Sequence, residues 1–333
     1  MTTARSVHPD PGLSPTGDEL SSGVNERSVT KGRGTPAWLG PFFALAGAWP
    51  SVARMLRPIA CAVVPLVSAG VREATRRNAR WIFGRDLCGA ERRRFTRRVV
   101  GSFYDFVLDV GRSSRMSPGE LAGLVEAVEG LEEYRAARAA RRGAILVTAH
   151  LGTFEVGLAA LAGEERRIRV VFKRDAAGAF ERMRARLHDA LGVVEAPIDD
   201  GMGTWLALRE ALQRDEVVVM QGDRAMPGQK SEVVPFLHGH LRLPTGPVRL
   251  ARLTGSPIIP VFALATGKGG YKVVLKAPIE ADGENATSAA GDPRAPSAME
   301  KLASAMAEVV AEHPHQWLAL EPVFHEDGAD GYR

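Results

Sequence analysis

The chain has 333 residues, of which 45% are hydrophobic and 25% charged, and this balance excludes a wholly disordered, collagen-like or low-complexity protein. Its 43 basic and 39 acidic residues give a net charge of +4, too small a surplus by itself to indicate a nucleic-acid-binding protein. Cys61 and Cys88 are its two cysteines, so a disulfide framework is excluded and a reducing compartment is the simpler expectation.

The first 72 residues divide into a polar tail and an apolar segment. Residues 1–36 mix small, polar and charged residues without apolar periodicity, which predicts a disordered tail and not a secretory signal. Residues 37–72 hold two uncharged runs separated by Arg54 and Arg57, each shorter than the roughly 20 residues that a spanning helix needs. We therefore expect an apolar helical segment that associates with a membrane, and the sequence leaves open whether it spans the bilayer or lies on it.

A basic block follows the apolar segment. Residues 71–100 contain ten arginines against three acidic residues. An apolar segment before a cationic helix is typical of a membrane-surface anchor whose arginines lie near anionic headgroups. A buried hairpin followed by a solvated basic helix is the alternative. Nucleic-acid binding is less favoured, because no aromatic-interleaved motif accompanies the arginines.

Helix and strand patterns alternate beyond the basic block. Residues 117–141 have helical periodicity with Ser117 as an N-cap, and residues 144–148 form an apolar run typical of a strand buried on both faces. This alternation predicts an α/β domain over residues 73–325, with a mixed, largely parallel central sheet flanked by helices, followed by a tail at 326–333. Further strands are expected at 168–172, 217–220, 232–236, 257–264 and 271–275, and helices at 180–191, 204–212, 247–253 and 298–311.

The segment with the clearest chemistry is residues 143–157. A buried strand ends there, His150 follows it, Gly152 permits a tight turn, and Glu155 enters the next helix. Catalytic groups of α/β proteins concentrate at the carboxyl ends of strands. With His150 in the turn, Glu155 can orient the imidazole as a general base, and the amides of Gly152 and of the helix N-terminus can stabilise an oxyanion. The spacing alone also fits a strand-end histidine and a helix N-terminal acid stabilised by the helix dipole.

The segment AHLGTFE at 149–155 resembles the histidine–acid block of the lipid A biosynthesis acyltransferases, which belong to the lysophospholipid acyltransferase superfamily. The resemblance extends over roughly residues 38–325, and blocks in this order are more specific than any one of them. The further blocks are RNARWIFG at 77–84, VVFKR at 170–174, QGDR at 221–224, PFLHG at 235–239, PTGP at 244–247, TGSPIIPV at 254–261 and QW at 316–317.

The chain departs from the family pattern at several positions. Thr153 stands where the family has asparagine, Lys173 where it has arginine, and Gly222 interrupts an acidic pattern. After Trp317 the family has aromatic and basic residues, whereas this chain continues with Leu318, Ala319, Leu320, Glu321 and Pro322. These departures concern the acceptor specificity more than the type of reaction.

The resemblance implies direct acyl transfer. His150, oriented by Glu155, would deprotonate a hydroxyl of a membrane glycolipid, such as a lipid A precursor, that attacks the thioester of acyl carrier protein or coenzyme A. The acyl thioester would be a co-substrate, and no cofactor, metal or acyl-enzyme would be needed. The expected location is the cytoplasmic face of a bacterial inner membrane, against an anionic lipid surface.

The same resemblance implies a set of substrate-binding residues. Lys173 and Arg224 would hold phosphate groups of the acceptor, Arg174 could substitute for Lys173, and Asp223 would position Arg224 or the acceptor sugar. Surface charges at strand ends are the alternative interpretation for each. The expected substrate-binding residues are Gly152, Lys173, Arg174, Asp223 and Arg224.

Two other functions stay open on the sequence. His238 and His240 form an H-x-H pair which, together with Asp223, would suit a metal-dependent hydrolase, although no carboxylate-rich motif follows. A non-catalytic lipid-binding relative would keep the fold without the reaction, and the presence of both His150 and Glu155 argues against it.

Overall fold

The central sheet has the strand order β1-β9-β8-β2-β5-β3-β4. All of its pairs are parallel except β8–β9, so the predicted mixed, largely parallel sheet is confirmed. The computed structural model describes residues 48–113, 115–174, 178–226, 228–281 and 296–325. The strands are β1 (Val125–Glu129), β2 (Ala144–Thr148), β3 (Ile168–Phe172), β4 (Val194–Pro197), β5 (Val217–Gln221), β8 (Ile258–Ala265) and β9 (Tyr271–Leu275), beside a separate antiparallel hairpin of β6 (Ser231–Phe236) and β7 (Gly239–Pro244).

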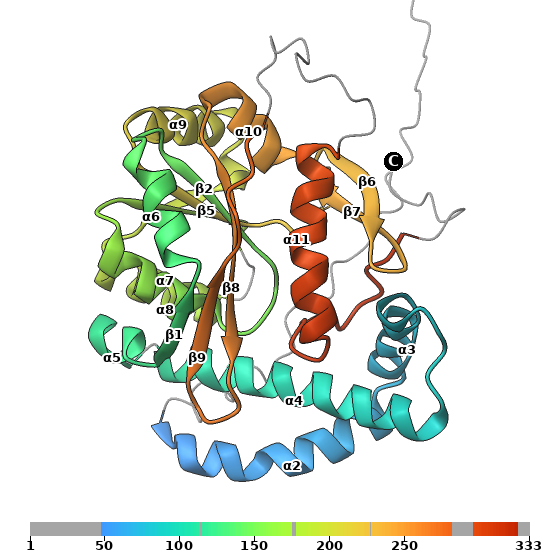
Figure 1. Cartoon of the computed structure of the whole chain (residues 1–333). Coiled ribbons are helices and arrows are strands. Elements are labelled where there is room, and N and C mark those ends of the chain that lie inside the picture. Colours follow the sequence, from blue (N-terminus) through green and yellow to red (C-terminus); the bar gives the residue numbers. More distant parts are fainter. Residues whose placement is uncertain (1–47, 114, 175–177, 227, 282–295, 326–333) are drawn as a thin grey trace, which may run out of the picture. The chain divides into compact units, whose positions relative to one another are not determined.

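Helices cover both faces of this sheet (Figure 1). On one face, Ile145 and Val147 of β2 pack in the same core as Met306 and Val310 of α11, while Leu146 packs on the other face with residues of α6 and α7. Successive strand residues point to opposite faces, so a strand covered on both sides is apolar throughout, as β2 is. The helices are α2 (Pro50–Val67), α3 (Ala69–Phe83), α4 (Gly89–Ser113), α5 (Pro118–Ala122), α6 (Leu131–Ala139), α7 (Phe154–Glu164), α8 (Gly178–Ala190), α9 (Met202–Gln213), α10 (Gly246–Thr254) and α11 (Ala298–Glu312).

The expected helix over 117–141 is wrong. The capping box of Ser117 and Glu120 does begin a helix there, but this helix, α5, is short and is followed by strand β1 and helix α6. Gly130 has a φ of +77°, and an added Cβ would lie 2.1 Å from the carbonyl oxygen of Leu275. A continuous helix through this position is therefore excluded, and α6 begins after it. Strand β1 lies at the edge of the sheet with most of its residues exposed, and it therefore lacks the apolar run that marks a buried strand.

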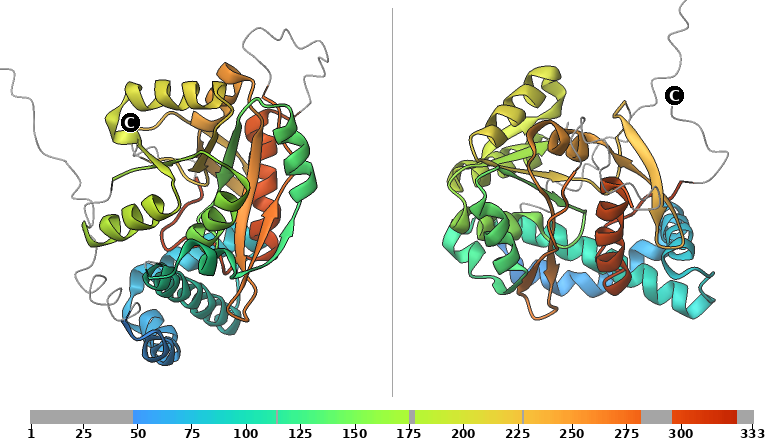
Figure 2. Two further views of the ribbon diagram at one scale, coloured as in Figure 1. Left: turned by 90° about the vertical axis from the view of Figure 1, so that its left-hand side faces the viewer. Right: turned by 45° about the horizontal axis from the view of Figure 1, so that its top comes forward.

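The apolar segment forms α2 from Pro50 onward, and the expected tails at 1–36 and 326–333 lie outside the described residues. Helix α2 packs along α4, and both views in Figure 2 show the two helices side by side. Ala53 is fully buried in this contact, and the Arg57 guanidinium donates to both oxygens of Asp105 at 2.6 and 2.7 Å. Among the described helices, α2 is the one long and apolar enough to cross a membrane by length and composition.

Helix α3 fastens the end of the described chain. The buried Asn78 amide donates to the carbonyl oxygens of Ala319 and Glu321 at 3.0 and 2.8 Å, and its oxygen accepts from the Val323 amide at 3.1 Å. The asparagine of the RNARWIFG block therefore holds the segment that follows Trp317, and the structure gives it no contact with the strand-end histidine.

Candidate active site

His150 lies in the turn between β2 and α7, and the backbone at the centre of this turn, at Gly152, has a conformation that requires glycine. Gly152 has a φ of +60°, and a Cβ added there would lie 1.8 Å from the carbonyl oxygen of Ala263. Residues with a side chain rarely adopt this conformation, and the neighbouring backbone of β8 leaves no space for one. On the other side of the turn, the amide of Leu318 donates to the carbonyl oxygen of His150 at 2.8 Å. The backbone that carries the imidazole is thus held between β8 and the segment after α11.

The partner of His150 is Asp223. His150 Nδ1 lies 2.6 Å from Asp223 Oδ1, and the imidazole is 34% exposed whereas the carboxylate is 1% exposed. The other oxygen, Oδ2, accepts from Trp317 Nε1 at 2.9 Å and from Arg224 Nη2 at 3.1 Å. Burial acts to raise the pKa of Asp223, but the charges of His150 and Arg224 and the hydrogen bonds from His150 and Trp317 outweigh it and hold this pKa well below its usual range. Asp223 is therefore a carboxylate with one oxygen directed to the imidazole.

The pairing of His150 with Asp223 follows from the sheet register. Strands β2 and β5 are parallel neighbours, with Thr148 opposite Gln221. His150 and Asp223 each lie two residues beyond these positions, so the two chains leave the sheet edge side by side. The family resemblance implies a substrate-positioning role for Asp223, and no local pattern of the sequence specifies that β5 lies beside β2.

The structure does not form the expected contact between Glu155 and His150, because the imidazole pairs with Asp223 instead. Glu155 is 6% exposed, and its Oε2 has no hydrogen-bond partner among the described residues. Burial raises its pKa to about 7, and the nearby charge of Asp109 adds to this effect. Glu155 is thus a buried acid at the start of α7 that binds a proton far more readily than an exposed carboxyl group does.

A buried polar network that the sequence did not reveal supports the same turn. The Thr153 hydroxyl donates to the Tyr271 hydroxyl at 3.0 Å, and the Tyr271 hydroxyl donates to Asp109. Asp109 comes from α4 and also pairs with Arg112 at 3.1 Å. Thr153, which replaces the asparagine of the family pattern, therefore still fixes the turn, through β9 and α4.

The basic residues expected at the site divide into two groups. Arg224 lies at the site, paired with Asp223. Lys173 and Arg174 follow β3, which is separated from β2 by β5, so they leave the sheet about 10 Å from His150. Arg174 makes a two-point ion pair with Asp200 at 2.5 and 3.0 Å. The structure therefore brings together His150, Gly152, Asp223 and Arg224, and it places Lys173 and Arg174 to one side.

His238 and His240 lie in the hairpin of β6 and β7, where His240 pairs with Pro235. Asp223, the third member of the metal site considered above, has its two oxygens bound by His150, Trp317 and Arg224. Within the described ranges, no group of three or more His, Cys, Asp or Glu side chains is placed to hold a metal ion.

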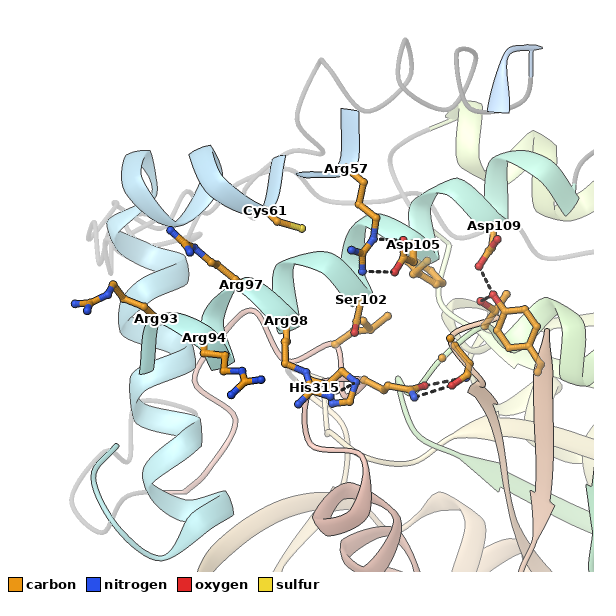
Figure 3. A pocket seen from close by; sticks show the side chains of 18 of the residues that line it. Arg57, Cys61, Arg93, Arg94, Arg97, Arg98, Ser102, Asp105, Asp109 and His315 are labelled. Atoms are coloured by element: carbon orange, nitrogen blue, oxygen red, sulfur yellow. Dashed lines mark hydrogen bonds and ion pairs between the residues drawn. The ribbon is translucent and has the colours of Figure 1, made fainter. Parts of the chain in front are cut away.

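Two cavities adjoin the turn. An apolar cavity of about 110 Å³ lies between the sheet and helices α6 and α7, and it reaches Leu151 beside His150. A larger cavity of about 540 Å³ is lined by residues of α2, α4, the turn and the segment after α11 (Figure 3). The apolar cavity is lined mainly by aliphatic and aromatic side chains, among them Leu131, Tyr134, Leu146, Leu151, Phe154, Leu158, Leu161, Val219, Val261 and Val273.

Comparison with known proteins places this chain in a family. Two phosphatidylinositol mannoside acyltransferases of Mycobacterium tuberculosis, from strains ATCC 25618 / H37Rv and CDC 1551 / Oshkosh, are each 27% identical to this chain. The matches cover 208 residues, or 62% of this chain and 62% of the relative, for the first, and 228 residues, or 68% of each, for the second. The chain thus matches less than two thirds of the first relative's length. A model of the bacterial lipid A biosynthesis acyltransferases matches residues 29–326, and the chain therefore belongs to this family.

Proposed function

We propose that the protein transfers a fatty acyl chain from an acyl thioester to a hydroxyl of a membrane glycolipid. The observation that carries this proposal is the imidazole of His150, one third exposed and paired through Nδ1 with the buried carboxylate of Asp223. An oriented imidazole at the carboxyl end of a buried strand is the arrangement that deprotonates a hydroxyl. Membership of an acyltransferase family supports a thioester carbonyl as the group attacked.

The geometry assigns a role to each nitrogen of the imidazole. Nδ1 donates its hydrogen to Asp223 Oδ1, which leaves the lone pair of Nε2 to accept the proton of the acceptor hydroxyl. The hydroxyl oxygen then attacks the thioester carbon, and the tetrahedral intermediate breaks its C–S bond. The imidazolium returns the proton to the leaving thiolate. Asp223 stays ionised and stabilises the imidazolium that forms between the two steps.

The apolar cavity beside Leu151 suits the acyl chain of the donor. Its lining is almost entirely aliphatic and aromatic, and it begins next to the residue that follows His150. An alkyl chain in this cavity removes apolar surface from water at roughly 25 cal/mol per Å². The thioester at the end of such a chain would lie beside the imidazole.

Helix α2 suits attachment to a membrane surface. Its large apolar side chains are exposed, and they flank the side of the helix that holds Ala53 and Arg57 against α4. We assign α2 to the plane of the interface, because a helix that crosses the bilayer would have to leave its contact with α4. The exposed apolar residues of this region are Trp49, Val52, Met55, Leu56, Ile59, Val63, Leu66 and Val67. The basic α3 and α4 favour an anionic, cytoplasmic leaflet of the bacterial inner membrane.

The names of the two relatives favour a phosphatidylinositol mannoside as the acceptor over a lipid A precursor. The test is an assay of purified full-length protein with radiolabelled acyl-carrier-protein and acyl-CoA donors against a panel of both lipid classes. We expect label to appear in a glycolipid product together with release of thiol. Release of free fatty acid without a labelled lipid would instead indicate a hydrolase, and lipid binding without turnover across the panel would indicate a non-catalytic relative.

A further inference from the structure

Four arginines of α4 line one wall of the larger cavity. They are Arg93, Arg94, Arg97 and Arg98 (Figure 3). All four are exposed, whereas the residues between and after these two pairs are buried. Spacings of one, four and five residues place all four on one side of a helix whose other side is in the core. The cavity of about 540 Å³ beside them has room for a group far larger than a water molecule.

Many other arginines of the protein pair with an acid, and these four do not within the part of the chain that the structure describes. Within the residues that the structure describes, none of the four guanidinium groups lies within 4.0 Å of a carboxylate oxygen. Arg98 contacts His315 Nε2 at 3.1 Å, and this imidazole is neutral at pH 7 because burial and the charge of Arg98 lower its pKa to about 4. By contrast, Arg85 and Arg142 on the surface make two-point ion pairs with glutamates.

The carboxylates that line the cavity do not neutralise the arginines. Asp105 accepts from both Arg57 Nε and Nη2, and Asp109 accepts from Tyr271 and from Arg112. Two like-charge pairs at a spacing of four residues, Arg93 with Arg97 and Arg94 with Arg98, repel each other along the helix and destabilise it. An anion in the cavity would remove this repulsion.

The cavity also reaches the turn that carries His150. Its lining includes Gly152 and Thr153 of the turn, together with Gln316 and Leu318. The Leu318 amide donates to the carbonyl oxygen of His150. A substrate that fills the cavity from the arginines to Gly152 therefore reaches the edge of the proposed catalytic site.

We propose that the arginine-lined cavity binds a phosphate ester of one of the two substrates and so positions that substrate against His150. The proposal rests on the proposed function and names the chemistry that the second cavity recognises. Guanidinium groups bind phosphate oxygens in a two-point geometry, and four of them match a group with more than one negative charge. Phosphate esters of this kind occur in the thioester donor, as nucleotide and pantetheine phosphates, and in a phosphatidylinositol-based acceptor, as its phosphodiester.

Steady-state kinetics of the full-length enzyme separate the two sources. The variant is Arg94→Gln with Arg98→Gln, and the matched control is Arg92→Gln, which removes a neighbouring exposed arginine that does not line the cavity. We expect the double variant to raise the KM for one substrate about tenfold or more, as the loss of charged hydrogen bonds does, with kcat within about twofold. A raised KM for acyl-CoA assigns the cavity to the donor, and a raised KM for the glycolipid assigns it to the acceptor.

A binding measurement keeps this test independent of turnover. Adenosine 3′,5′-bisphosphate and glycerophosphoinositol are titrated against His150→Ala protein, with and without the two arginine substitutions. We expect one probe to bind His150→Ala protein and to lose about tenfold or more in affinity when the arginines are removed. Such arginine-dependent binding, together with a wild-type protein that transfers no acyl group to any acceptor of the panel, would retain this proposal and overturn the proposed function.

Two results overturn the phosphate site. The first is a double variant whose two KM values and probe affinities equal those of Arg92→Gln and of wild type. The second is an equal loss in Arg92→Gln, which would show a general effect of surface charge. We expect each variant to unfold at the same temperature as the wild type, because all three substituted side chains are exposed. This result would show that the variants are folded.

Discussion

The central residue is His150, and its chemistry depends on which acid holds it. Asp223 contacts the imidazole at 2.6 Å and is itself fixed by Trp317 and Arg224, whereas the buried Oε2 atom of Glu155 has no hydrogen-bond partner in the described part of the chain. Both acids stand in blocks that resemble the family, so sequence alone favoured the acid that is nearer in the chain. The structure favours the acid on the neighbouring strand.

Asp223→Asn and Glu155→Gln therefore have unequal effects on catalysis. Asparagine can hold the imidazole but does not stabilise its charged form, so we expect kcat to fall by about a hundredfold or more. Glutamine has the shape of the neutral form of Glu155, which burial favours, so Glu155→Gln changes the site little. We expect its kcat to exceed that of Asp223→Asn by at least about tenfold. Acyl-transfer rates of the two purified variants decide this, and equal losses would restore Glu155 as the orienting acid.

The raised pKa of Glu155 leads to a prediction about how the stability of the fold depends on pH. This pKa is about 7 in the folded protein against about 4.5 in the unfolded chain, so the folded state binds the proton more tightly. Raising the pH through this interval therefore destabilises the fold, by about 2 kcal/mol between pH 5 and 8, and the loss levels off above pH 7. The free energy of urea unfolding should fall by that amount more in wild type than in Glu155→Gln. Parallel pH profiles for the two proteins would show that Glu155 does not titrate in this range.

At the scale of elements, the sequence predicted best what lies in the core. Strands β2, β3 and β9 were predicted with their observed bounds, because β2 is apolar throughout and the other two are largely apolar. Edge strand β1 has no such apolar run, because its exposed residues are free to be charged, and the periodicity there predicts a helix instead. The pairing of His150 with Asp223 depends on the order of strands β2 and β5, which no local pattern specifies.

The turn between β2 and α7 gives a test at this scale. Gly152→Ala would place a methyl group 1.8 Å from a backbone oxygen of β8, so we expect a loss of at least about 2 kcal/mol in unfolding free energy and displacement of His150. Gly163→Ala in α7 is the control, because its added Cβ meets nothing within 4 Å and alanine favours a helix. Chemical denaturation measures both, and equal stabilities would mean that the turn adapts to a side chain.

Helix α2 gives a second test. Met55 and Leu66, which are 77% and 74% exposed, would enter the lipid interface if α2 lies in its plane. We expect Met55→Glu with Leu66→Glu to reduce flotation with anionic vesicles by about tenfold or more, since charged side chains oppose insertion. Leu253→Glu, at an exposed leucine of α10, should leave flotation unchanged. Unchanged flotation of the double variant would remove α2 from the membrane contact.

At the scale of residues 48–325, the carboxyl edge of the sheet joins three features within the described chain. His150 and Asp223 leave this edge, the apolar cavity opens beside Leu151, and the arginine-lined cavity reaches Gly152. Helix α4 contributes both the cationic wall and Asp109, which supports the turn through Tyr271. Four of the ten arginines of the basic block therefore line a cavity that reaches the turn of His150.

The central claim is that His150 is the general base of acyl transfer, and a single-turnover measurement tests it most directly. Enzyme in excess over labelled donor, with saturating acceptor, reports the chemical step without product release. We predict that His150→Ala slows this step by about a hundredfold or more while the affinity for donor is retained. A variant that transfers the acyl group within about threefold of the wild-type rate would contradict the account.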